Sequence, residues 1–135
     1  MALRVVRLGS PRAPGEGLRI GTVRRQPRGV PKEQYAALDY YDEWLPELAP
    51  SAELMGWIHA EQKANGEADA KAWQSFSKRY RSEMARPEAL RLLKLLAGLS
   101  RQTELSVGCY CENEARCHRS LLRDLLRDNG AAMAP

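Results

Sequence analysis

The residues with the greatest chemical potential are gathered in one short stretch near the end of the chain. The 135-residue sequence contains three cysteines and two histidines. All three cysteines and one histidine fall between positions 109 and 118, as Cys109, Cys111, Cys117 and His118. Residues of these types can hold a metal ion, form a reactive thiolate, or pack as small side chains. The three interpretations make different demands on spacing and surroundings.

A metal site is the first interpretation. Three thiols and an imidazole are ligands that zinc prefers. Their spacing differs from that of a structural zinc finger, in which the ligands form two pairs with about two to four residues inside each pair. The neighbours Cys117 and His118 would also point in different directions at the start of a helix. We therefore expect no metal site and no other cofactor.

A nucleophilic thiolate is the second interpretation, with either Cys111 or Cys117 as the nucleophile and His118 as the base of a hydrolase or transferase. Cys117 precedes a helix, and a helix N-terminus lowers the pKa of a thiol. Four residues separate Cys111 from Arg116, which loosely resembles the anion-cradling loop of sulfurtransferases. Two acidic residues in that loop, at 112 and 114, would repel an anion.

The third interpretation makes the cysteines small buried side chains, the commonest role of this residue type. The start of the last helix then either binds a ligand or is only capped. An anion there could accept hydrogen bonds from unpaired backbone N–H groups, the Ser120 hydroxyl and the guanidinium groups of Arg116 and Arg119. Both alternatives remain open at this point.

The elements that position these residues follow from hydrophobic periodicity and from turn and cap residues. The pattern predicts strands over 3–8, 18–23 and 103–111, and helices over 52–63, 70–84, 87–100 and 117–129. It also predicts a short helix over 32–38 and an irregular stretch over 40–51. In the strand over 18–23, Leu18, Ile20 and Thr22 are expected to face opposite to Arg19. Ser51 and Asp69 are expected N-caps.

This element order favours an α/β fold, with a small, largely parallel sheet flanked by helices in a single compact domain. The domain is expected to span 1–135, with flexible ends at 1–2 and 131–135. Arg24 and Arg28 follow the second strand, while Arg116 and Arg119 follow the last one. If those two strands are parallel neighbours, their carboxyl ends share an edge, and the four arginines line one pocket with His118 and Ser120. Such a pocket suits a small anionic or phosphorylated ligand.

Composition limits the remaining classes of function. Hydrophobic residues make up 44% and charged residues 28% of the chain, as in a folded soluble protein. Without an export signal or a membrane-spanning stretch, we expect a cytoplasmic protein with reduced thiols and no membrane partner. The net charge of +4 permits a nucleic-acid-associated regulator. We consider that class less favoured, because the sequence has no basic helix or groove rich in aromatic residues.

Four ordered segments resemble a known family. They are "RIGTVRRQPRGVPKEQ", "DEWLPELAPSAEL", "WQSFSKRYRSEM" and a strand ending in cysteine that leads through an acidic connector to "CHRSLL". Together they are similar to bacterial and archaeal proteins of the "domain of unknown function 488" family. The resemblance implies a compact α/β fold without an established reaction. Two positions depart from the family pattern: Val23 replaces an acidic residue, and Gln26 replaces a tryptophan.

Overall fold

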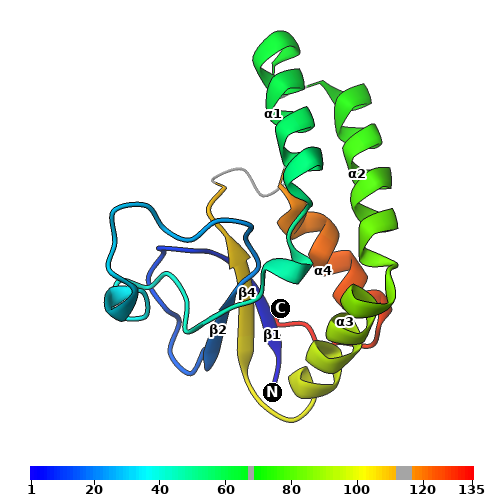
Figure 1. Cartoon of the computed structure of the whole chain (residues 1–135). Helices are drawn as coiled ribbons and strands as arrows, with labels where there is room; N and C mark the ends of the chain where they lie inside the picture. Colours follow the sequence, from blue (N-terminus) through cyan, green and yellow to red (C-terminus); the bar gives the residue numbers. More distant parts are fainter. Residues whose placement is uncertain (67–68, 112–116) are drawn as a thin grey trace.

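The computed structural model describes residues 1–66, 69–111 and 117–135. Four parallel strands form one sheet in the order β1-β4-β2-β3. Their bounds are Leu3–Arg7 for β1, Leu18–Gly21 for β2, Glu43–Trp44 for β3 and Leu105–Cys109 for β4. The helices are Ala52–Asn65 (α1), Ala70–Met84 (α2), Pro87–Ser100 (α3) and His118–Asp128 (α4). The α/β fold with a parallel sheet is thus confirmed (Figure 1).

The central strand β4 positions the candidate functional residues, because the cysteine-bearing segment begins at its end. It pairs in parallel with β1 on one side and with β2 on the other. Every residue of β4 is buried, because the helices cover one face of the sheet and the β2–β3 connection packs on the other. Since β2 and β4 are parallel neighbours, the condition set out from the sequence is met, and their carboxyl ends share an edge of the sheet.

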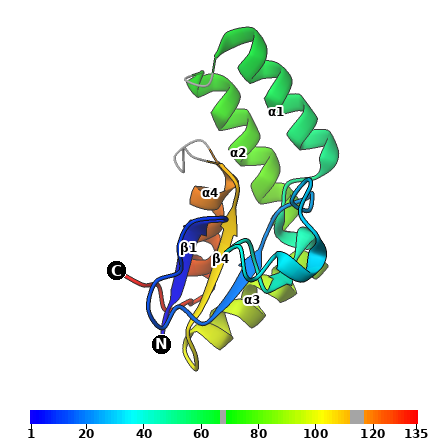
Figure 2. The ribbon, with the colours of Figure 1, turned by 90° about the vertical axis from the view of Figure 1, so that its left-hand side faces the viewer.

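The α1–α2 hairpin extends past this edge of the sheet, while α3 and α4 pack nearer its centre (Figures 1 and 2). The Ser51 side chain accepts a hydrogen bond from the N–H of Leu54, and Asp69 accepts from the N–H groups of Lys71 and Ala72. Both predicted N-caps are therefore confirmed. The predicted bounds of α2 and α3 also match the structure.

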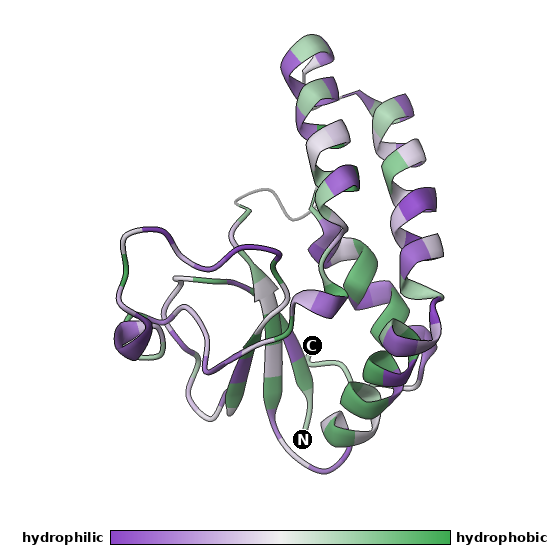
Figure 3. Ribbon diagram, viewed as in Figure 1, coloured by the Kyte–Doolittle hydropathy of each residue, from purple (hydrophilic) through white to green (hydrophobic). Residues whose placement is uncertain are grey.

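Apolar residues concentrate on the strands and along α3, while polar residues dominate the α1–α2 hairpin and the β2–β3 connection (Figure 3). The main core lies between the sheet and the helices and includes Leu54, Phe76, Tyr80 and Leu122. A smaller cluster of six buried residues lies under the β2–β3 connection: Leu8, Val23, Tyr35, Tyr41, Cys109 and Cys117. Among the described residues, none of the helices combines the length and apolarity needed to cross a bilayer.

One local prediction is wrong, and one charged side chain is buried without a signal in the sequence. The stretch 40–51 contains the edge strand β3 and a short 3-10 helix over Pro46–Leu48. In β2, Leu18 is 46% exposed whereas Arg19 is fully buried. Arg19 can be buried because its guanidinium pairs with Glu16 at 2.7 Å and also donates to the carbonyl oxygens of Ser10 and Asp39.

Candidate functional site

Three hydrogen bonds connect the end of β2 to its neighbours, two to β4 and one to the first residue of α4. The backbone N–H and the hydroxyl of Thr22 both donate to the carbonyl oxygen of Gly108, at 3.0 and 2.9 Å. The carbonyl oxygen of Thr22 in turn accepts from Nε2 of His118 at 2.8 Å. The sheet edge and the helix start are therefore held together at a single point.

This contact determines the protonation state of His118. The side chain is buried, and burial lowers its pKa, so the imidazole is neutral at pH 7. A carbonyl oxygen can only accept, so Nε2 carries the proton and Nδ1 keeps its lone pair. Nδ1 lies 3.7 Å from the sulfur of Cys117. The lone pair on Nδ1 can thus accept the proton of the Cys117 thiol across this distance.

Two of the three thiols lie in direct contact, and the third lies in the cavity beside them. The sulfur atoms of Cys109 and Cys117 are 2.6 Å apart, and both residues are buried. Cys117 occupies the N-cap position of α4, and Cys109 is the last residue of β4. Cys111 is exposed and lies two residues after Cys109, and both line the same cavity. One accessible thiol therefore lies beside a pair that is shielded from solvent.

The electrostatics of this cluster favour a thiolate on Cys111. Hydrogen bonds from Cys109 and Cys117 hold the pKa of the Cys111 thiol well below its usual value, and the nearby charge of Arg119 acts in the same direction. The pKa of Cys109 is raised, because its thiol donates to Cys111 and is buried. Of the three thiols, the exposed Cys111 is thus the one that loses its proton most readily.

Cys109, Cys117 and His118 offer ligand atoms that all lie within 4.8 Å of one another. The 3.7 Å separation of Cys117 Sγ and His118 Nδ1 suits two ligands of one metal ion. The 2.6 Å separation of the two sulfur atoms does not. Two thiolates on a tetrahedral zinc ion lie about 3.8 Å apart, as follows from a Zn–S bond of about 2.3 Å. The cluster has the donor types of a metal site without its spacing.

A cavity of about 440 Å³ lies beside the cluster. Its described lining comes from the loop after β2, the start of α1 and the end of β4. The lining residues are Val23, Arg24, Arg25, Arg28, Pro50, Ala52, Met55, Gly56, His59, Cys109, Tyr110, Cys111 and His118. None of these residues is acidic, so the described wall combines an apolar surface with three guanidinium groups.

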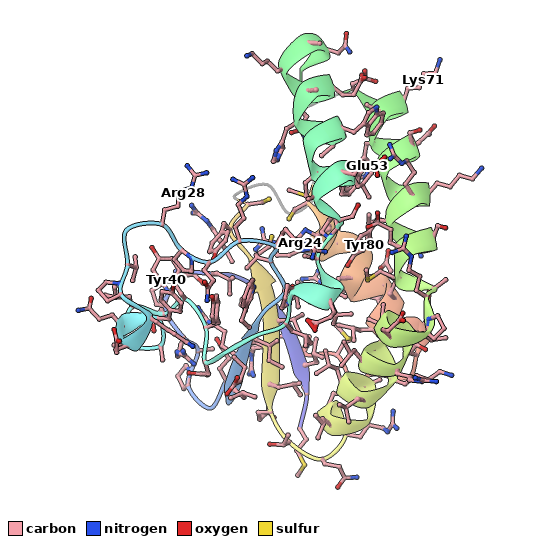
Figure 4. The ribbon with its side chains drawn as sticks, viewed as in Figure 1. Arg24, Arg28, Tyr40, Glu53, Lys71 and Tyr80 are labelled. Carbon is pink, nitrogen blue, oxygen red and sulfur yellow. The ribbon has the colours of Figure 1, made fainter. Side chains whose placement is uncertain are left out.

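Arg24 and Arg28 differ in how firmly they are held. The Arg24 guanidinium donates to the carbonyl oxygens of Pro50 and Ala49, at 3.2 and 3.4 Å, which ties the loop to the start of α1. Arg28 is exposed on the outer part of the same loop (Figure 4). Within the described segments, neither Arg25 nor Arg28 forms an ion pair.

The structure brings four of the sequence-predicted site residues to the cavity: Arg24, Arg28, Cys111 and His118. The Arg119 guanidinium is buried and donates to the carbonyl oxygen of Cys111 at 2.7 Å. The Ser120 hydroxyl donates to the carbonyl oxygen of Cys117 at 3.0 Å. Cys117, Arg119 and Ser120 are therefore not part of the cavity lining. The side chains of Arg119 and Ser120 hold the backbone of Cys111 and Cys117 in place. Arg116 lies outside the described residues.

The uncharged part of the cavity lining was not predicted from the sequence. Met55 and Gly56 belong to the first turns of α1, and Tyr110 follows β4. The other histidine, His59, is exposed and belongs to the lining of the cavity. The Tyr110 hydroxyl donates to the carbonyl oxygen of Arg25 at 3.0 Å, so it also positions the arginine loop. No local pattern marks these residues, because α1 reaches the sheet edge only through tertiary packing.

Together these features define a small parallel α/β protein with a thiol cluster and an arginine-bearing cavity at the carboxyl edge of its sheet. Over residues 3–130 the chain matches the DUF488-N3a family model, described as "Active DUF488-N3 subclade". The chain therefore belongs to the DUF488 family, which confirms the resemblance found in the sequence.

Two relatives illustrate the family. The "Uncharacterized protein YeaO" of Escherichia coli (strain K12) is 29% identical over 127 residues, which cover 94% of this chain and 98% of that protein. The "Uncharacterized protein Rv3073c" of Mycobacterium tuberculosis (strain ATCC 25618 / H37Rv) is 29% identical over 124 residues, 92% of each chain. No solved structure matches this chain.

Proposed function

We propose that this protein binds a small anionic ligand, such as a phosphorylated metabolite, in the cavity between the loop after β2 and the end of β4. The observation that carries the proposal is that Arg24, Arg25 and Arg28 share one cavity with residues from the end of β4. Ligands of parallel α/β proteins bind at this edge of the sheet. A cavity of about 440 Å³ also has the size of a small-molecule site.

The charges around the cavity support an anion. Guanidinium groups bind phosphate and carboxylate with charge-assisted, often bidentate, hydrogen bonds. Arg24 is fixed by two carbonyl oxygens, while the outer Arg28 has the freedom to close on a ligand. The apolar wall that includes Pro50 and Met55 would contact the uncharged part of the same molecule.

A second candidate function, a thiol-dependent hydrolase or transferase, is favoured by the position of Cys111. This exposed thiol lines the arginine-bearing cavity, and hydrogen bonding from Cys109 and Cys117 lowers its pKa. The Cys111 sulfur would attack an electrophilic atom of the bound anion, forming a covalent intermediate while the leaving group departs. The description of the matched subclade as active agrees with a reaction at this site. Cys117 is less suited to attack a ligand, because it is buried behind the lining.

Ligand-induced stabilisation tests the anion site. We expect inorganic phosphate or adenosine monophosphate to raise the melting temperature of the parent protein, because a ligand at about 100 times its Kd stabilises by about 2.7 kcal/mol. The shift should shrink in Arg28→Ala and persist in the matched control Arg91→Ala, whose arginine is exposed on α3. If no anion stabilises the parent protein, the binding proposal is wrong.

Alkylation separates the thiol reaction from binding. Iodoacetate is anionic and iodoacetamide is neutral, so the ratio of their rates reports the local charge at Cys111. We expect mass spectrometry to find Cys111 modified first, with a higher iodoacetate-to-iodoacetamide ratio than free cysteine gives. The ratio should fall in Arg28→Ala and in high salt. A ratio equal to that of free cysteine would contradict the proposal that the arginines act on the Cys111 thiol.

A further inference from the structure

The three cysteines differ in exposure to solvent. One is exposed, and the other two are buried with their sulfur atoms in contact. Cys109 and Cys117 are 1% and 2% exposed, and their sulfur atoms are 2.6 Å apart. Cys111 is exposed and lines the cavity together with Cys109, two residues before it in the chain. The accessible thiol can thus meet a reagent from solvent, while the buried pair cannot meet it directly.

The buried pair is close to the geometry of a covalent bond. A disulfide has an S–S distance of about 2.05 Å, so the two sulfur atoms need to approach by only a small amount. The two residues come from the end of β4 and the start of α4. These elements are already held together through Thr22 and His118, so bond formation demands no rearrangement of the sheet and helix.

We propose that Cys109, Cys111 and Cys117 form a redox-active site that reduces low-molecular-weight disulfides and stores the oxidised state as a Cys109–Cys117 disulfide. The proposal goes beyond ligand binding and shares only Cys111 with the thiol chemistry suggested above. The only chemical feature that the co-substrate requires is an S–S bond. Unlike the ligand proposed above, it does not have to be an anion.

The reaction is a relay of three thiol–disulfide exchanges. The Cys111 thiolate attacks one sulfur of the small disulfide, which forms a mixed disulfide and releases a small thiolate. The sulfur of Cys117 then attacks that of Cys111, which forms a Cys111–Cys117 bond and releases the second small thiol. The sulfur of Cys109 finally attacks that of Cys117, which closes the buried disulfide and returns Cys111 as a thiolate.

Atoms and electrons balance over the relay. Two protein thiols are oxidised, and one small disulfide is reduced to two thiols. The protons of Cys109 and Cys117 leave on those products. His118 Nδ1, 3.7 Å from Cys117, is placed to take up the proton of that thiol as it becomes the attacking group. Formation of the buried disulfide also removes both thiol donors from Cys111, which couples the redox state to the reactivity of the cavity.

The test treats the full chain with bis(2-hydroxyethyl) disulfide, a neutral probe whose reaction does not depend on the anion site. We expect the intact mass to fall by two hydrogens without a lasting adduct. Trypsin cuts after Arg116 and chymotrypsin after Tyr110, so the cysteines fall on three separate peptides. The linked peptides should be those of Cys109 and Cys117.

Three variants check the order of the relay, with far-UV circular dichroism confirming that each is folded. Cys111→Ser should slow the oxidation about tenfold or more, because no accessible thiol remains. Cys117→Ser should keep the probe or a Cys109–Cys111 bond, and Cys109→Ser should stop at Cys111–Cys117. The proposal is overturned if the parent protein retains a stable adduct on Cys111. It is also overturned if all three thiols resist the probe, or if the protein as purified holds a metal whose removal is needed for oxidation.

Discussion

Nε2 of His118 lies 2.8 Å from the carbonyl oxygen of Thr22, although the two residues are 96 positions apart in the sequence. Thr22 follows β2, and His118 begins α4, so one hydrogen bond connects the arginine loop to the cysteine cluster. Both residues are buried, and water cannot replace this contact. The arrangement of the site therefore depends on a neutral imidazole with its proton on Nε2.

Substituting His118 tests that dependence. His118→Leu removes the donor and leaves the buried carbonyl of Thr22 without it, so we expect a loss of about 1–3 kcal/mol in unfolding free energy. His118→Gln can place an amide N–H near the position of Nε2 and should lose less. Urea unfolding followed by circular dichroism measures both variants. Equal losses would mean that the hydrogen bond contributes little.

The buried ion pair between Glu16 and Arg19 is expected to be a major stabilising contact. Glu16→Gln leaves the fully buried Arg19 guanidinium without its counter-charge, which typically costs about 3–5 kcal/mol. The matched control is Glu104→Gln, which breaks the surface pair with Arg4 at 3.0 Å. The control should lose little in the same urea unfolding experiment, because exposed ion pairs are screened. Similar losses in both variants would contradict the prediction.

The same pair predicts how stability depends on pH. Burial of Glu16 opposes ionisation, but hydrogen bonds from Arg19, Ser106 and Ala13 outweigh it and lower the pKa of Glu16 to about 2. A carboxyl group with a lowered pKa in the folded state stabilises fully above its unfolded pKa of about 4.3. That stabilisation is lost as the pH falls from there towards 2. Urea unfolding across this range should show a steeper decline for the parent protein than for Glu16→Gln.

Two glycines predict opposite effects of the same substitution. A Cβ atom on Gly108 would lie 2.5 Å from the carbonyl oxygen of Val6, so Gly108→Ala should cost about 1–3 kcal/mol through strain in the central strand. At Gly56, inside α1, a Cβ atom would meet none of the described residues within 4 Å. Gly56→Ala should therefore stabilise by about 0.5–1 kcal/mol, because alanine favours a helix. Thermal melts that rank the two variants the other way would refute this account.

Local patterns predicted the helices and their caps well. Phe76 and Tyr80 recur at helical spacing along α2 and are buried, and Trp73 stacks on Phe76 with 5.0 Å between ring centroids. Such periodicity and cap residues act within a few positions of each other, so the sequence alone displays them. The parallel sheet was also predicted correctly, because the order of strands and helices favours it.

The predictions failed where distant partners decide the structure. The two residues of β3 form a strand only because they pair with Ile20 and Gly21 at the sheet edge. Arg19 is buried because Glu16 and two carbonyl groups surround it, which alternation along β2 does not indicate. The contact between Cys109 and Cys117 likewise depends on how α4 docks against β4. Each feature requires tertiary contacts that no short segment carries.

The place of β4 between β1 and β2 has a consequence for synthesis of the chain. On the ribosome, the first two strands emerge about a hundred residues before the strand that both of them pair with, as their registers with Leu105–Cys109 require. Until then, β1 has neither of its later neighbours among the described strands, and β2 can pair only with the two-residue strand β3. The α1–α2 hairpin, by contrast, makes mostly local contacts and can form early. Chains that stop short of residue 105 are accordingly expected to engage chaperones and proteases, and native assembly begins only after nearly the whole polypeptide has been released.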